Sequence, residues 1–230
     1  MAEASAVEPA GSKLERRRFA MFAVAMVLWL GGFVFVRVQG NWTPFALFGV
    51  TLVAIAIASD ARVRELLHPR WIHVAAGGVV GVTMVLLTHG AFEVVSDALP
   101  IARQSTWRLF TLLDVVGFTP AQRAGLIVVI AACEEVIFRG ALLGPAGHSS
   151  GDPWHRIDRR DLLHVLGWAV AYALATATLG SWLLVLCAWC CGVLWGLLRI
   201  VTRSLVAPII AHVAWDLGVL VLWPLVFAEM

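Results

Sequence analysis

The sequence predicts an all-α membrane protein, a polytopic helical bundle with about seven spans. Hydrophobic residues make up 60% of the 230 residues and charged residues only 14%. The mean hydropathy is +0.86. A soluble domain of this length cannot bury so much apolar surface, so the lipid bilayer must cover the excess. The formal charge of +2 is small and scattered, which argues against a nucleic-acid partner.

The chain begins with residues 1–18, which we expect to form a disordered cytoplasmic tail because they are mostly small or polar and show no periodicity. The first apolar run follows, from Phe19 to Val36. Arginines precede it, as in a secretory signal, but the run is longer than a usual signal core and no small-residue cleavage site follows it. We therefore expect a retained first span and one membrane helical domain over residues 19–228.

Six further apolar runs have close to the ~20 residues that a membrane-spanning helix needs. The run Val74–His89 contains several glycines, which weaken an isolated helix but also let neighbouring membrane helices pack closely. The prediction is therefore seven spans, or six if this run does not cross. The six runs are Trp42–Ser59, Val74–His89, Ala121–Phe138, Leu162–Leu179, Ser181–Leu198 and Leu205–Phe227.

Arginines gather in alternate connections between the runs, and this sets the expected orientation. Connections rich in Lys and Arg stay in the cytoplasm, so we expect a cytoplasmic N-terminus. The stretch Ala91–Phe118 would then lie on the outer face, where its mixture of charged and apolar residues predicts an amphipathic, interfacial segment. The arginines concerned are Arg16 to Arg18, then Arg62, Arg64 and Arg70, then Arg156, Arg159 and Arg160, and finally Arg199 and Arg203.

The run that starts near Pro120 ends in a charged sequence, EEVIFRG, at residues 134–140. Glu135 and Arg139 are four residues apart and can pair, whereas Glu134 is turned about 100° away and can face another group. The alternative is that these charges only mark a helix end among lipid headgroups. Residues 121–133 are too short to span a membrane, however, so the helix must continue to near Gly140 and carry Glu134 below the surface. A charge there costs at least ~2.5 kcal/mol and predicts a cavity or a partner.

The last run contains a second pair of ionisable residues, His212 and Asp216, whose spacing of four puts them on one helical face. A lone histidine in an apolar helix is more often a hydrogen-bonded packing residue, but an aspartate one turn away favours a functional pair. Counting along each helix puts His212 ~12 Å into the membrane and Glu134 ~9 Å above its inner face. We expect these residues to share a polar cavity that faces the cytoplasm.

The motif EEVIFRG, followed by GVLWGLLRIVTRSLVAPIIAHVAWD at residues 192–216, resembles the CPBP family, which includes the type II CAAX prenyl proteases and bacterial Abi proteins. The resemblance covers about residues 110–222. It implies an intramembrane endopeptidase that hydrolyses a peptide bond of a membrane-anchored peptide or protein substrate, for which CAAX-type substrates are one option. It also implies an integral protein of a prokaryotic plasma membrane.

The resemblance implies a role for each matching residue. Glu134 would activate the attacking water, Glu135 and Arg139 would brace the helix, and His212 with the residue at 216 would stabilise the oxyanion. These roles agree with the chemistry of the residues, because an apolar cavity disfavours the charged form of a carboxylate and so suits a general base. The imidazole can donate a hydrogen bond to a developing oxygen charge.

The sequence departs from the family pattern at two of its positions. Thr176 aligns with a second histidine, and threonine can neither take up a proton nor bind zinc well. Asp216 stands where an asparagine is usual. An ionised aspartate would oppose an oxyanion unless it were protonated or paired, for which Arg199 and Arg203 are candidates.

Two other functions stay open at this stage. A catalytically inactive membrane binding or regulatory protein is compatible with Thr176, and a small transporter could move protons through Glu134, Glu135 and His212. The transporter is disfavoured because the chain lacks paired repeat halves. The cofactor is undetermined: Glu134 and His212 alone are too few ligands for zinc, and a general-base mechanism needs no metal.

Overall fold

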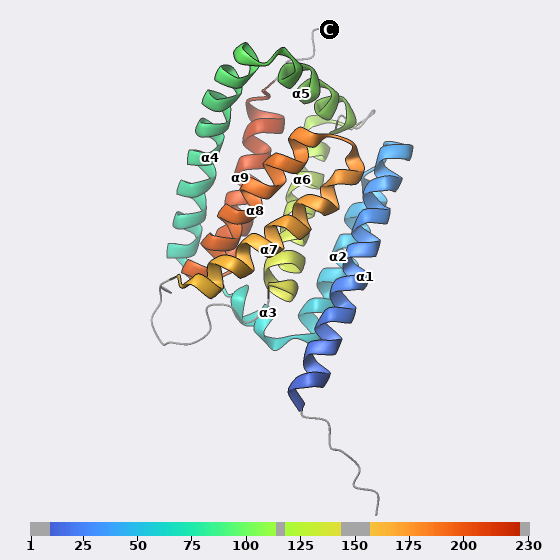
Figure 1. The fold of residues 1–230 in the computed structure, drawn as a ribbon, viewed down its shortest axis with the longest axis vertical. Coiled ribbons are helices and arrows are strands. Elements are labelled where there is room, and N and C mark those ends of the chain that lie inside the picture. Colours follow the sequence, from blue (N-terminus) through green and yellow to red (C-terminus); the bar gives the residue numbers. More distant parts are fainter. Residues whose placement is uncertain (1–9, 114–117, 144–156, 226–230) are drawn as a thin grey trace, which may run out of the picture.

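Helices account for all the regular structure in the residues that the computed structural model describes, which are 10–113, 118–143 and 157–225 (Figure 1). The predicted all-α fold is confirmed. A helix satisfies its backbone hydrogen bonds internally, which a chain surrounded by lipid requires. In chain order the elements are α1 (Ala10–Gln39), α2 (Thr43–Ser59), α3 (Ala61–Leu66), α4 (Trp71–Ala98), α5 (Pro100–Leu113), α6 (Pro120–Glu134) with a π-helical continuation (Glu135–Leu142), α7 (Arg159–Thr176) with a 3₁₀ turn (Ala177–Leu179), α8 (Trp182–Thr202), and α9 (Val206–Leu217) with a π-helical end (Gly218–Leu222).

The apolar runs of the sequence correspond to α1, α2, α4, α6, α7, α8 and α9 with their continuations. Within the described ranges, three helices are long and apolar enough to cross a membrane, namely Trp71–Ala98, Arg159–Leu179 and Trp182–Thr202. Shorter apolar helices cover Ala23–Gln39, Thr43–Ser59 and Val206–Leu222. The glycine-containing run thus belongs to one of the three long helices, α4.

Helix α1 begins at Ala10, inside the segment 1–18 that the sequence predicts as a disordered tail. Residues 13–18, KLERRR, are mostly strong helix formers and directly precede the apolar run, so they extend its helix toward the N-terminus. Residues 1–9 of the expected tail lie outside the described part of the chain. The helical part of the chain therefore starts earlier than the apolar run alone indicates.

The two ends of the bundle differ in their connections (Figure 1). Helix α5 lies across one end, which we call the α5 end. Short helix α3 and the starts of α4 and α7 lie at the other end, which we call the arginine-rich end; its arginines are Arg62, Arg64, Arg70, Arg159, Arg160 and Arg203. Helix α4 continues to Ala98, so it includes the first part of the stretch predicted as interfacial, and α5 forms most of the rest.

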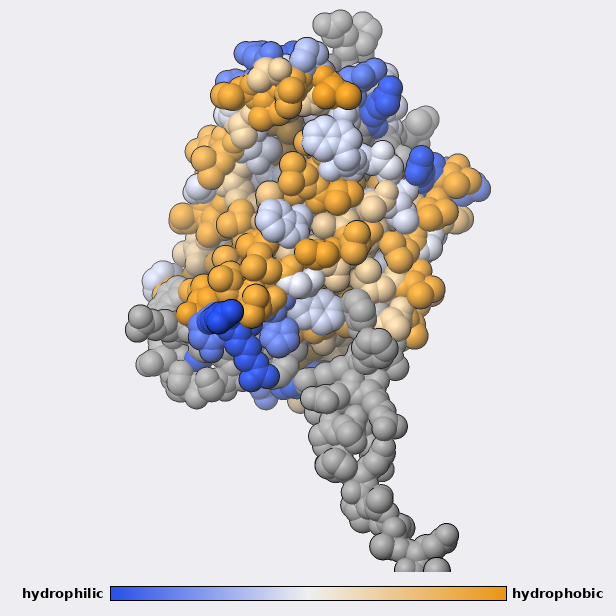
Figure 2. Space-filling view, viewed as in Figure 1, coloured by the Kyte–Doolittle hydropathy of each residue, from blue (hydrophilic) through white to orange (hydrophobic). Residues whose placement is uncertain are grey.

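The sides of the bundle expose large apolar side chains, as a lipid-covered surface requires. Figure 2 shows hydrophobic residues over most of the middle of the visible face, with hydrophilic residues toward its ends. The exposed fraction is 67% for Val27 on α1, 59% for Leu86 on α4 and 59% for Leu174 on α7. Contiguous apolar surface of this extent is unusual on soluble proteins and matches contact with lipid tails.

Glycines of α4 allow it to pack closely against α9, the helix that carries His212. A Cβ atom at Gly77 would meet the carbonyl oxygen of Ala207, and a Cβ at Gly81 would lie 2.7 Å from the Cβ of Ala214. Gly78, between them, has nothing within 4 Å of the same position. The small residues therefore serve the close helix contact that their spacing in an apolar run suggests.

Replacing Gly81 by leucine should destabilise the protein by about 2 kcal/mol, because the added side chain overpacks the α4–α9 contact. Thermal unfolding in detergent would measure this as a lowered melting temperature. Gly78→Leu is the matched control, since it adds the same side chain to the same helix in open space. Equal melting temperatures for the two variants would contradict the packing described here.

Candidate active site

Helix α6 carries Glu134, and local sequence signals determine where this helix starts. Thr119 Oγ1 accepts a hydrogen bond from the Gln122 N–H at 3.2 Å, and the Thr119 N–H donates to Gln122 Oε1 at 2.8 Å. This reciprocal capping box, with Pro120 at the first helical position, anchors the helix at the α5 end. At 1.5 Å per residue, Glu134 lies ~21 Å further along the axis, deep inside the bundle.

From Glu135 the helix widens into the π-helical segment that ends at Leu142, whereas the sequence predicts an α-helix to near Gly140. The Leu143 N–H donates to the Phe138 carbonyl at 3.0 Å, which is the five-residue spacing of a π-helix. Every residue from Glu135 to Gly140 is buried, so this segment packs against neighbours on all its faces. The change of helix type falls between the two glutamates, whose carboxylates have different partners.

One carboxylate oxygen of Glu135 contacts both the Arg139 guanidinium and the His212 imidazole. Arg139 Nη1 lies 3.0 Å from Glu135 Oε1, and His212 Nδ1 lies 2.9 Å from the same atom. Glu135 is completely buried and Arg139 is 3% exposed. The Arg139 guanidinium also lies 4.4 Å from the ring centroid of Tyr172 and 5.4 Å from that of Trp195. Glu135 therefore ties its own helix to α9, and the pairing expected from the sequence is present.

The imidazole of His212 presents its two nitrogens to different groups. Its ring stacks on Trp195 with centroids 3.6 Å apart and an angle of 20°. Because Nδ1 contacts Glu135, Nε2 faces the other way, 3.9 Å from Glu134 Oε2 and 3.4 Å from Asp216 Oδ2. The two glutamates, Arg139, His212 and Asp216 thus come together, as their depths in the sequence suggest.

Asp216 has His212 as its partner, whereas the sequence suggests Arg199 or Arg203. Arg199 is fully buried, and its Nε donates to the Arg139 carbonyl at 3.3 Å. The His212–Asp216 contact follows from their separation of one helical turn. His212 therefore supplies a group that can neutralise Asp216.

Tyr172 is a member of the site that the sequence reasoning missed. Its Oη donates a hydrogen bond to Glu134 Oε2 at 2.6 Å, and the residue is buried. The resemblance to the CPBP family implies a role for position 176 and none for Tyr172. One signal could have identified it, because Tyr172 is the only tyrosine in a chain with 11 Phe and 11 Trp residues, and its hydroxyl lies in an apolar run.

Residues 115–218 match the family described as type II CAAX prenyl endopeptidase, Rce1-like. The chain carries an Rce1-like domain. The match confirms the resemblance to the CPBP family, and its limits lie inside the predicted 110–222. All the site residues predicted from the sequence fall within the Rce1-like domain. No curated protein and no solved structure matches the chain.

Thr176 of the Rce1-like domain lies at the wall of the same cavity as Glu134, but its hydroxyl is already used. Thr176 Oγ1 donates to the Ala173 carbonyl at 2.8 Å, within its own helix. The polar group that contacts Glu134 from α7 is Tyr172, one turn earlier. Position 176 therefore lies on the cavity wall in this domain, with its hydroxyl hydrogen-bonded to the backbone of its own helix.

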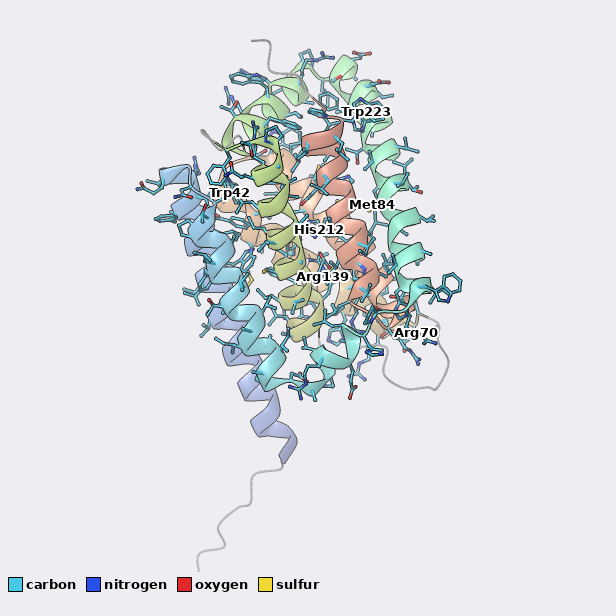
Figure 3. All side chains as sticks on the ribbon, turned by 180° about the vertical axis from the view of Figure 1, so that it is seen from behind. Trp42, Arg70, Met84, Arg139, His212 and Trp223 are labelled. Carbon is cyan, nitrogen blue, oxygen red and sulfur yellow. The ribbon has the colours of Figure 1, made fainter. Side chains whose placement is uncertain are left out.

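A cavity of about 580 Å³ connects Glu134 and His212 to the α5 end of the bundle. Its lining includes Trp42, Trp107 on α5, and Arg123 near the start of α6. Figure 3 shows Trp42 toward that end, with His212 deeper and Arg139 beyond it on the side of Arg70. The sequence predicts both a cavity that faces the cytoplasm and cytoplasmic arginine-rich connections, whereas the cavity opens at the opposite, α5 end. Helix rise gives the depth of a residue, but the side of opening depends on which space the packed side chains fill.

The described residues do not fit a zinc ion. No group of three or more His, Cys, Asp or Glu side chains in the described ranges is arranged to hold a metal. The nitrogen Nδ1 of His212 contacts Glu135, while Glu134 accepts from Tyr172, so the hydrogen bonds already orient both groups. Zinc sites in proteins need at least three such ligands around one point.

Proposed function

We propose that this protein is an intramembrane endopeptidase that hydrolyses a peptide bond of a membrane-anchored substrate, with Glu134 as the general base. The observation that carries the proposal is the 3.9 Å separation of Glu134 Oε2 and His212 Nε2 at the inner end of a cavity. That separation is too long for a direct hydrogen bond and suits a water or a substrate oxygen between the two groups. The Rce1-like domain supports the same reaction class.

In the proposed reaction, the Glu134 carboxylate takes a proton from water as the water oxygen attacks the scissile carbonyl carbon. The carbonyl oxygen becomes an oxyanion and accepts a hydrogen bond from His212 Nε2–H. Glu134 then gives its proton to the leaving amine as the carbon–nitrogen bond breaks. The contacts of His212 with Glu135 and Asp216 would favour the protonated imidazole that can donate from both nitrogens.

Tyr172, one turn before the position where the family pattern has a histidine, would orient the general base. Its hydrogen bond to Glu134 Oε2 fixes the carboxylate and uses one lone pair of that oxygen, so the other lone pair can still accept from a water on the side of His212. This role needs no proton transfer by the phenol, since Glu134 carries the proton in both steps. The absence of a histidine at position 176 is then compatible with catalysis.

The membrane arrangement that goes with this function has seven spans and a cytoplasmic N-terminus, in a prokaryotic plasma membrane. Residues 19–228 would form one membrane domain around the Rce1-like segment. The alternation of arginine-bearing connections supports this arrangement. CAAX-type peptides are one substrate option, which the name of the family suggests.

Cleavage of a pooled set of membrane-anchored reporter peptides by the purified full chain in detergent tests the function. Wild type should cut at least one reporter, and His212→Ala should cut none. If wild type binds reporters without cutting them and Thr176→His cuts, the natural protein is a non-catalytic relative. The hydrogen bond of the Thr176 hydroxyl to its own helix is the observation that gives this second candidate weight.

Removing the Tyr172 hydroxyl should slow cleavage without weakening substrate binding. A hydrogen bond to a charged group contributes about 1.5–3 kcal/mol, so Tyr172→Phe should lower kcat roughly 10- to 100-fold with KM little changed. Thr176→Val is the matched control, because it removes a hydroxyl from the same cavity wall but one that donates its hydrogen bond to the backbone of its own helix. Equal kcat values for the two variants would show that Tyr172 does not orient the base.

A further inference from the structure

The cavity is continuous from the glutamates to the α5 end and reaches the surface there. Trp107 and Thr111 of α5 line it, and both are exposed, with Trp107 at 50%. Two residues of α6 line the cavity at different depths, Arg123 near its mouth and Glu134 at its inner end, and we call these depths its two levels. At 1.5 Å per residue these levels are ~16 Å apart, which is about the length of five residues of extended peptide.

On the other side of the glutamates, packed side chains fill the interior of the described part of the chain. Arg139 and Arg199 are buried beneath Glu135, and Arg199 donates to the Arg139 carbonyl. Two buried apolar clusters continue this packing toward the arginine-rich end. They consist of Val63, Leu66, Val136 and Leu205, and of Leu143, Val165 and Ile200.

The distribution of basic residues indicates which side of the membrane each end faces. The α5 end carries Arg37, Arg103, Arg108 and Arg123, whereas the connections at the other end carry the arginine clusters described above. Connections richer in Lys and Arg remain in the cytoplasm. The α5 end, where the cavity opens, would therefore face the outside of the cell.

We infer that the site receives its substrate from the extracytoplasmic side, as an extended apolar peptide segment that enters beside α5. The inference rests on the proposed peptidase function for its chemistry and on the cavity and the arginines for its direction. The walls between the mouth and the site are apolar, with Phe33, Leu126, Ile130 and Leu184 among them. Polar groups lie at the inner end, where the peptide bond would be cut, so an apolar segment of about five residues suits the cavity.

The side of access can be measured without any catalysis. In a background with the four cysteines replaced by alanine or serine, Thr111→Cys places a thiol at the cavity mouth, and His68→Cys places one at the exposed arginine-rich end. A membrane-impermeant maleimide added to intact cells should label Thr111→Cys alone, with His68→Cys reacting only after the membrane is permeabilised. Labelling of His68→Cys but not Thr111→Cys in intact cells overturns the inference.

A second arm uses the unmodified chain and so does not depend on the cysteine-free variant folding. Two reporters with the same anchor and the same Leu/Ala segment carry that segment on opposite sides of the membrane. The outer reporter should be cut and the inner one should not. Cleavage of the inner reporter alone overturns the direction of access and leaves the peptidase intact. If neither is cut while the labelling pattern holds, the peptidase proposal fails and the direction stands.

Discussion

Replacing Glu134 by glutamine should abolish peptide cleavage while leaving the fold intact. General acid–base catalysis contributes about 10²- to 10⁴-fold, so we expect kcat to fall by roughly 10³-fold with KM nearly unchanged. The amide has almost the same shape as the carboxylate and can still accept from the Tyr172 hydroxyl, but it cannot take a proton from water. Initial rates with a single anchored reporter would measure the loss.

Two controls separate this effect from a loss of structure. Glu93→Gln makes the same chemical change on an exposed part of α4 and should retain full activity. The melting temperature of Glu134→Gln should stay near that of wild type, because the ion pairs of Arg139 and His212 with Glu135 remain. Substantial cleavage by Glu134→Gln would transfer the role of general base to another group, for which Asp216, 3.4 Å from His212 Nε2, is the candidate.

The sequence predicts the parts of this structure that depend on local signals. Hydrophobic runs locate the helices, the capping box at Thr119 locates the start of α6, and a spacing of four predicts both the Glu135–Arg139 and the His212–Asp216 pairs. Helix rise also gives Glu134 and His212 compatible depths. All of these follow from periodicity and propensity within one segment of the chain.

The features that the sequence does not predict depend on how the helices pack. A π-helix is less favourable than an α-helix, so the π-helical segment that begins at Glu135 depends on its contacts with other helices. The bond from Tyr172 to Glu134 joins residues 38 positions apart on different helices. Val136, Leu205 and their neighbours close the cavity on one side. Their sequence shows only that they are apolar, which fits burial against lipid as well as burial against protein.

The His212 imidazole takes part both in holding the helices together and in the proposed reaction. His212 contacts Glu135 through Nδ1, which holds α9 against the π-helical segment, and faces Glu134 through Nε2, where the reaction would occur. The Trp195 ring stacked on it limits rotation of the imidazole, so the two contacts are made together. Adjacent glutamates on one helix can therefore serve stability and chemistry separately.

This separation predicts that Glu135, unlike Glu134, is needed for the fold. Glu135→Ala removes the carboxylate that Arg139 and His212 share and leaves a buried guanidinium without that partner. Breaking a buried ion pair by removing one partner costs about 3–5 kcal/mol. We therefore expect the largest loss of stability of any single change at the site, measured as a lowered melting temperature in detergent.

The double variant Glu135→Leu with Arg139→Met distinguishes loss of the charge pair from loss of packing. Apolar residues of similar volume can replace a buried pair at little cost, so the double variant should melt higher than Glu135→Ala although it too lacks the carboxylate. It should nevertheless cleave poorly, because His212 loses its partner at Nδ1 and with it the fixed direction of Nε2. A Glu135→Ala variant as stable as wild type would mean that the shared carboxylate does not hold α9 to the π-helical segment.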